Sequence, residues 1–278
     1  MAALRSMPQL IFDVSALQTW GEIWLGTAPT TATKPKKKVG ARKSTRAKPR
    51  PKSKPKLANR FAKKQSMDFG GIFDRAFGTA LAEMLGNIPV KKPHAKSLLP
   101  AAADCVEVGT TRIVGGIRPQ NFDAAYRPDG PRVVFDSKTL NDTKSVAKNW
   151  QNMVNDLATE ASTVHTRFPM CVVAFIVVIP RPALEPAQER DIIRTLERLG
   201  SRKTELDQHH LAEALAFVVW NPADGSIDET IPPANSPLRI EKFNEVVTKS
   251  YTSRYKNLPP HQESDPDETG EDYLNVTT

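Results

Sequence analysis

Three side chains that can act together lie on two neighbouring segments of the sequence. Asp123 belongs to the first segment, and Asp136 and Lys138 belong to the second. Side chains alternate along a strand, so Asp136 and Lys138 share one face of theirs. The Pro-Asp-Gly-Pro sequence between the segments is typical of a hairpin turn. A turn centred on its Asp-Gly pair predicts a register with Asp123 opposite Asp136. The same register sets Asn121 opposite Lys138.

This arrangement predicts a particular chemistry. Directly opposed strand residues have Cβ atoms about 5 Å apart, and like charges at that separation destabilise a sheet. A divalent cation offsets the repulsion, and carboxylate oxygens with open water positions suit Mg²⁺. A lysine beside the ion orients and helps to deprotonate a water, and stabilises charge on the attacked phosphate. The pattern therefore predicts metal-assisted phosphodiester hydrolysis. An ordinary solvated hairpin, on which Lys138 neutralises Asp123 and Asp136, is the alternative interpretation.

The hydrophobic periodicity predicts the elements that must position these residues. Before the hairpin it indicates a helix over 68–85, capped by Asp68, and a strand over 111–117. The hairpin strands are expected over 120–127 and 132–140, followed by a helix that opens at Asp142 and a buried strand between Pro169 and Pro180. Farther on, we expect helices over 186–199, 207–215 and 236–255, and a strand over 216–220. This order predicts an α/β (α+β) fold with a mixed central sheet flanked by helices and an αβββαβ core.

An Asp on one hairpin strand and Asp-x-Lys on the next, followed by a helix and a buried strand, resemble the PD-(D/E)xK nuclease superfamily. Restriction endonucleases belong to that superfamily, and the resemblance covers roughly residues 68–180. It implies that Asp123 and Asp136 bind Mg²⁺ and that the main-chain carbonyl of Ser137 adds a ligand. Lys138 would be the catalytic lysine. Phe122 stands where the proline that names the motif would be.

The same resemblance makes two further acids, Glu83 and Glu107, candidates for the site. The adjacent His209 and His210 are not expected to bind a metal, because neighbouring side chains project from a helix in different directions. Two active sites cut two strands in many restriction-type enzymes, so the resemblance also allows a homodimer.

Residues 34–64 form a strongly basic run. It holds fifteen of the 39 Lys and Arg side chains and none of the 31 Asp and Glu side chains. Repeated Lys-Pro and Arg-Pro steps, charge repulsion and few apolar residues predict a disordered arm. Such an arm binds phosphates without sequence preference, whereas a solvated linker is the alternative. The candidate DNA contacts are Lys36, Lys37, Lys38, Arg42 and Lys43 in the arm, and Lys144 and Lys148 on the polar face of the helix after the hairpin. That face is equally compatible with an ordinary solvated helix surface.

The chain is accordingly divided into an N-terminal segment (1–33), the basic arm (34–66), an α/β core (67–257) and an acidic tail (258–278). The N-terminal segment has apolar residues that suit docking on the core or on a partner. Cys105 and Cys171 give neither a disulfide framework nor zinc spacing, and no apolar run reaches the length of a membrane span. We therefore expect a cytoplasmic protein without a membrane segment.

These observations predict a Mg²⁺-dependent endonuclease that cuts double-stranded DNA, a type II restriction-type enzyme. The alternative is a noncatalytic DNA-binding or chromatin-associated protein that acts through the basic arm. Neither helix-turn-helix nor zinc-finger spacing is present in the sequence to read bases through a standard module.

Overall fold

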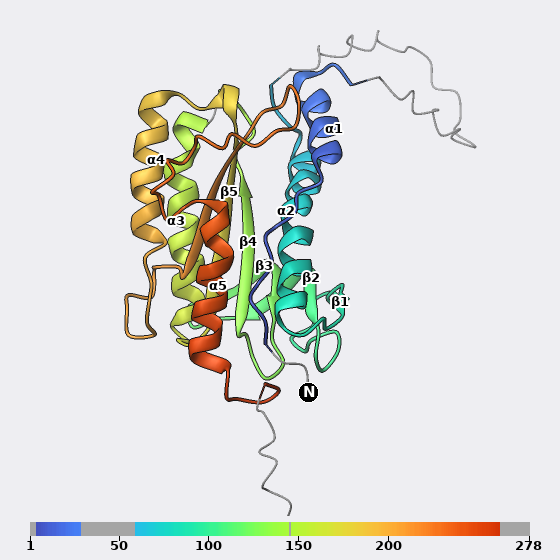
Figure 1. Ribbon diagram of the computed structural model, residues 1–278, viewed down its shortest axis with the longest axis vertical. Coiled ribbons are helices and arrows are strands. Elements are labelled where there is room, and N and C mark those ends of the chain that lie inside the picture. Colours follow the sequence, from blue (N-terminus) through green and yellow to red (C-terminus); the bar gives the residue numbers. More distant parts are fainter. Residues whose placement is uncertain (1–3, 29–58, 145, 262–278) are drawn as a thin grey trace, which may run out of the picture.

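The computed structural model describes residues 4–28, 59–144 and 146–261 of the 278-residue chain (Figure 1). Its elements, in chain order, are α1 (Val14–Leu25), α2 (Lys63–Met84), β1 (Val90–Lys91), β2 (Val106–Val114), β3 (Pro119–Tyr126), β4 (Val133–Thr139), α3 (Val146–His165), β5 (Val172–Pro180), a 3-10 turn (Arg181–Ala183), α4 (Pro186–Leu199), β6 (Ala214–Trp220) and α5 (Ile240–Tyr255). The six strands form one sheet in the order β1-β2-β3-β4-β5-β6. β2, β3 and β4 pair antiparallel, whereas β1 pairs parallel with β2, and β4, β5 and β6 pair parallel. The expected mixed α/β fold is confirmed.

Helices cover both faces of this sheet (Figure 1). On the face of α2 and α5, the ring of Phe77 stacks on Phe135 with 4.0 Å between centroids. On the face of α3 and α4, Leu157 and Leu196 belong to a second buried cluster. β5 lies between the two layers and all nine of its residues are buried, which explains its uninterrupted apolar sequence.

The N-terminal segment packs on the core of the chain, beside α2 (Figure 1). Asp13 caps α1 by accepting the N–H of Ala16 at 3.0 Å, and Gly26 ends the helix with a left-handed φ of 78°. Trp24 is 1% exposed, and its Nε1–H donates to the carbonyl of Asn141 at 2.7 Å. Of the two interpretations of the N-terminal apolar residues, docking on the core is the one observed.

The chain enters and leaves the segment 29–58 at one place. The N–H of Asn59 donates to the carbonyl of Trp24 at 2.8 Å, and the N–H of Thr143 donates to the carbonyl of Asn59 at 3.3 Å. The residues that flank 29–58 are therefore held together, next to the loop that follows β4. The candidate DNA contacts of the arm lie outside the described residues, as does most of the acidic tail. Those contacts are Lys36, Lys37, Lys38, Arg42 and Lys43.

Several element boundaries differ from the predictions. α2 begins at Lys63 rather than Asp68, because Gln65 caps it by accepting the N–H of Ala62 at 2.8 Å. The first long strand covers 106–114 rather than 111–117, and α5 begins at Ile240 rather than Ser236. The boundaries of α4 agree with the prediction.

The predicted helix over 207–215 was wrong. The carboxylate of Asp207 accepts the N–H groups of Lys203 and Thr204 at 2.8 and 2.9 Å, which closes a turn instead. β6 then begins at Ala214. His209 and His210 are exposed in this irregular stretch.

Cys105 and Cys171 are both buried free thiols. Among the described residues, no helix combines the length and apolar character that crossing a membrane requires.

Candidate active site

The hairpin brings the two predicted aspartates to the point where its strands part. The paired residues of β3 and β4 are Ala124 with Phe135, Ala125 with Val134, and Tyr126 with Val133. This is the register predicted from the symmetric turn. Asp123 and Asp136 come directly after the last pair. Beyond it β3 pairs with β2 alone, so the expected pairing of Asn121 with Lys138 does not form, and Asn121 pairs with Arg112.

Asp123, Asp136 and Lys138 are joined by hydrogen bonds where the strands separate. The carboxyl groups of Asp123 and Asp136 share a hydrogen bond, and Asp123 Oδ2 also accepts the N–H of Ser137 at 3.2 Å. Lys138 Nζ donates to Asp136 and, at 2.8 Å, to Glu160 Oε1. Asp136 is 6% exposed, whereas the side chain of Lys138 is 25% exposed. Asp123 and Lys138 are thus partly accessible, whereas Asp136 is buried between them and the sheet.

Two acids that the sequence analysis missed join this group from helices. Glu160 of α3 is 5% exposed, and its Oε1 also accepts Gln120 Nε2–H at 3.0 Å. Its Oε2 is buried and has no hydrogen-bond partner in the part of the chain that the structure describes. Asp74 of α2 accepts the hydroxyl of Ser137 at 2.7 Å from the other face of the sheet. We call these five residues the Asp-Lys cluster: Asp74, Asp123, Asp136, Lys138 and Glu160.

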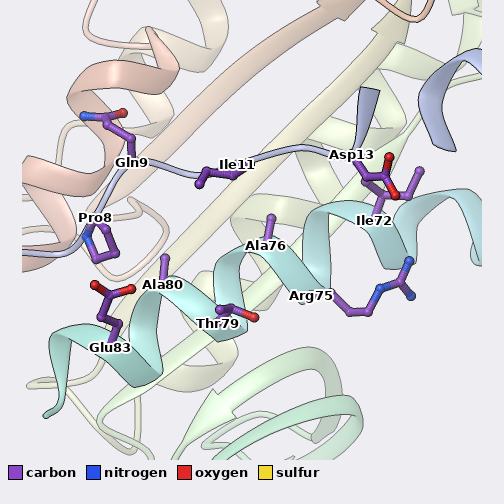
Figure 2. Close-up of a pocket in the computed structure, with 10 residues that line it drawn as sticks. All are labelled: Pro8, Gln9, Ile11, Asp13, Ile72, Arg75, Ala76, Thr79, Ala80 and Glu83. Carbon is purple, nitrogen blue, oxygen red and sulfur yellow. The ribbon is translucent and has the colours of Figure 1, made fainter. Parts of the chain in front are cut away.

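The two acids proposed from the resemblance lie elsewhere. Glu107 is fully buried on β2 and pairs with Arg127, with 2.5 Å between Oε2 and Nε. Glu83 follows Asp74 by nine residues, or two and a half helical turns, and so lies on the opposite side of α2. Figure 2 shows Glu83 beside Pro8 at one end of a cavity of about 280 Å³, where the N-terminal segment runs alongside α2.

Burial makes the three aspartates of the cluster, Asp74, Asp123 and Asp136, unusually hard to ionise. It raises the pKa of Asp123 to about 8, with a further contribution from its hydrogen bond to Asp136. Burial and then the charge of Asp123 raise the pKa of Asp74 to about 8. The pKa of Asp136 is raised to about 6 by burial, which outweighs the opposing effects of Asp123 and Lys138. Burial alone would lower the pKa of Lys138, but Asp136 and Glu160 raise it above its usual range.

The cluster gathers four carboxyl groups around one lysine, and the raised pKa values of Asp74 and Asp123 show that these acids lack a cation that would favour their ionised forms. No family model, no curated protein and no solved structure matches this chain. The cluster must therefore be interpreted from its own chemistry, and its excess of carboxyl groups suits a bound cation.

The donor set fits a magnesium ion. Within the described residues, no three His, Cys, Asp or Glu side chains are grouped as a metal site. Mg²⁺ needs fewer, because proteins usually hold it with one or two carboxylates and several waters. Asp123 and Asp136 supply such a pair. The N–H and C=O of one strand residue point to the same side, so the carbonyl of Ser137 faces the parting strands together with the N–H that Asp123 accepts.

Lys144 and Lys148 are exposed at the beginning of α3. Glu160 lies twelve residues after Lys148, which corresponds to about 18 Å along the helix at 1.5 Å per residue. A duplex that reached both places would contact the two lysines several base pairs away from the Asp-Lys cluster.

We expect Mg²⁺ to stabilise the folded protein through Asp123 and Asp136. With 10 mM Mg²⁺ and a dissociation constant of about 1 mM, linkage gives about 1.4 kcal/mol, or roughly 4 °C in Tm for a core of this size. Differential scanning calorimetry of wild type and of Asp123→Asn/Asp136→Asn, with Mg²⁺ or EDTA, measures this shift. The exposed Asp191→Asn variant is the matched control and should keep it. An equal shift in the double variant would place the ion elsewhere.

Proposed function

We propose that this chain is a magnesium-dependent deoxyribonuclease that hydrolyses phosphodiester bonds within double-stranded DNA, an endonuclease of restriction type. The observation that supports it most is the meeting of Asp123, Asp136 and Lys138 where β3 and β4 separate. A solvated hairpin face would leave these groups exposed and paired with water. Here Asp136 is buried, shares a hydrogen bond with Asp123, and has its pKa raised further by the charge of Glu160.

Each residue has a distinct role in this proposal. Asp123 and Asp136 would hold Mg²⁺ with the carbonyl of Ser137. The bound ion would polarise the phosphate and lower the pKa of a coordinated water. Lys138 remains a cation beside these carboxylates, so it would donate hydrogen bonds to the attacking water and to the charge that develops on the phosphate. Glu160 fixes the lysine in that orientation through its 2.8 Å contact.

DNA binding is assigned mainly to the basic run. Its cations bind phosphates without reading bases, and such binding weakens steeply with salt. The residues that flank 29–58 are tied to Trp24 and Thr143. The segment 29–58, which holds most of these cations, is therefore flanked on both sides by residues near the carboxyl end of β4, the strand that carries Asp136 and Lys138.

Incubation of supercoiled plasmid with purified protein, in Mg²⁺ or in EDTA, tests this function. We expect cleavage in the presence of Mg²⁺ and no cleavage in EDTA. A site-specific enzyme would give discrete fragments. A linker variant, in which a short Gly-Ser linker replaces residues 29–58, keeps α1 in the chain. It should bind DNA more weakly, while its Mg²⁺-dependent cleavage stays detectable at low salt. If wild type never cuts, and the linker variant loses nearly all binding, the noncatalytic DNA-binding function replaces our proposal.

A further inference from the structure

The turn between β2 and β3 lies beside the Asp-Lys cluster. Its residues, 115–118, have the sequence Gly-Gly-Ile-Arg. Shortly after the turn, β3 carries Gln120, whose Nε2–H donates to Glu160 Oε1 at 3.0 Å. The same oxygen accepts Lys138 Nζ at 2.8 Å. We call residues 115–118 the Gly-Gly turn, and it is two residues away from a direct contact of the cluster.

The backbone of the Gly-Gly turn is held against α3. The N–H of Gly116 donates to the carbonyl of Thr163 at 2.8 Å, and the N–H of Gly115 donates to the carbonyl of Arg118 at 3.3 Å. A Cβ at position 115 would lie 2.2 Å from the carbonyl oxygen of Thr163, and one at position 116 would lie 2.5 Å from Cγ2 of Thr166. Only glycine lets the backbone come this close to the helix. The position of the turn is therefore determined by α3.

The helix also sets the distance between the turn and the cluster. Thr163 follows Glu160 by three residues, which corresponds to about 4.5 Å along α3 at 1.5 Å per residue. DNA rises by about 3.4 Å per base pair. A duplex that runs along α3 with a phosphate at Lys138 would therefore meet the Gly-Gly turn within about two base pairs of that phosphate.

The exposed side chains of the turn suit a contact with DNA. Ile117 is 61% exposed, and Arg118 is exposed beside it. Arg167, which follows α3 and is also exposed, donates through Nη1 to the carbonyl of Val114 at 3.0 Å, directly before the turn. Neither Arg118 nor Arg167 forms an ion pair with an acid in the described part of the chain. Both cations are therefore available to phosphates.

With these arginines, α3 has cations beside both of its ends. Lys144 and Lys148 are exposed at its beginning, and the cluster lies between them and the Gly-Gly turn. The twenty residues of α3 span about 30 Å, or about nine base pairs. Its exposed face carries one acid, Asp156, among neutral side chains that can bond to phosphates: Gln151, Asn152, Asn155 and Thr159.

We propose that the Gly-Gly turn and the adjoining end of α3 bind the DNA duplex next to the cleaved phosphate. Arg118 and Arg167 would bind phosphates of the backbone. Ile117 would pack on the sugars and base edges of the adjoining groove, a use of apolar side chains that is common beside arginines in DNA contacts. This inference rests on the proposed nuclease function, because it takes the position of the DNA from Lys138.

DNA binding in EDTA, measured by the fluorescence anisotropy of a labelled duplex at several salt concentrations, tests the contact without cleavage. Ile117→Asp should weaken binding at least about tenfold, because it sets a carboxylate against the phosphates. Arg118→Gln should lower the slope of log K against log salt by about 1. The control variants Ile11→Asp and Arg5→Gln change exposed residues of the N-terminal segment, which packs beside α2 (Figure 1), and should leave affinity and slope unchanged.

A tethered reagent tests the location. Cys105 and Cys171 are buried, so an iron–EDTA reagent should label Ile117→Cys at the new thiol. Without Mg²⁺ this tether should nick plasmid, whereas the same tether on Ile11→Cys should not. Wild-type affinity and slope in both turn variants, or equal nicking by the two tethers, would overturn the inference. A wild-type protein that never cuts in Mg²⁺ would contradict the nuclease function instead, because none of these measurements requires cleavage by the protein.

Discussion

Asp136→Asn and Lys138→Met are each expected to lower the rate of DNA cleavage about a thousandfold, because a positioned charge at the reacting phosphate contributes on that scale. The Asp136→Asn substitution would remove one of the two carboxylates that hold the metal in our proposal. The Lys138→Met substitution would remove the ammonium group that donates to the attacking water and to the phosphate in our proposal. The measurement is the single-turnover rate with saturating enzyme on a plasmid substrate, which reports chemistry apart from product release.

Asp136→Asn should preserve the folded state, since it removes one acid from a crowded cluster. Lys138→Met removes the counter-charge of Asp136 and Glu160, so thermal unfolding of this variant must accompany its rate measurement. Asp191→Asn and Lys92→Met change exposed residues of the same types, and we expect near wild-type rates from both. The cleavage rate of Glu160→Gln should lie between that of wild type and those of the two site variants, about tenfold below wild type. Lys138 would lose its contact with the Glu160 carboxylate but keep its contact with Asp136. Wild-type rates in Asp136→Asn and Lys138→Met would return the three residues to an ordinary hairpin surface.

Glu213→Gln is expected to cost about 3–5 kcal/mol of folding free energy, because it leaves Arg202 and Arg254 buried without a counter-charge. For a core of this size that corresponds to a fall in Tm of roughly 10 °C. Thermal and urea unfolding at pH 7 measure the loss. Glu245→Gln, an exposed change on α5, is the control and should stay within about 0.5 kcal/mol of wild type.

The same residue predicts how stability depends on pH. Burial alone would raise the pKa of Glu213, but His165, Arg254 and the N–H of Val173 outweigh burial and lower it. A carboxyl group with a lowered pKa stabilises the folded state above its unfolded pKa of about 4.3. That contribution is lost as the pH falls through the folded value. Wild type should therefore lose its advantage over Glu213→Gln below pH 4. A constant difference down to pH 2.5 would contradict this assignment.

The local patterns were sufficient for the central part of the fold. The apolar run of β5 and the Pro-Asp-Gly-Pro turn each determine their structure within a few residues, so the hairpin register could be predicted. The start of α2 could not be predicted, because the charges of Lys63 and Lys64 assigned both residues to the basic run. Lysine is a good helix former, and Gln65 supplies the cap. At 207–215, a helix-compatible composition was overridden by the turn that Asp207 closes.

The sequence predicted the site residues that lie close together on one hairpin. It did not predict the site residues that come from the helices. Asp123, Asp136 and Lys138 lie on one hairpin, so strand alternation relates them. Glu160 comes from a helix whose place depends on the whole sheet. A signal was nonetheless present, since Glu160 follows Leu157 by three residues and interrupts the apolar face of α3.

Asp74 gives a similar signal, because it lies between Phe73 and Phe77 on the side of α2 that faces the sheet. A half-buried acid beside an apolar helical stripe needs a partner, and here the partner is Ser137. Charged residues on the buried face of a helix are therefore the feature of this sequence that would have extended the predicted site.

The anchoring of Asn59 to Trp24 limits how far the basic run reaches. Twelve of its cations lie within residues 29–58, and the residues on both sides of that segment are fixed beside the loop that follows β4. With about 3.5 Å of chain per residue, no residue of the segment can lie more than about 50 Å from the anchor. Twelve charges in the half-sphere outside the protein amount to a local concentration on the order of 0.1 M, comparable with physiological salt. Under the proposed function, these twelve cations would act as counterions of the DNA, and the chain on both sides of them is fixed beside the end of the strand that bears Asp136.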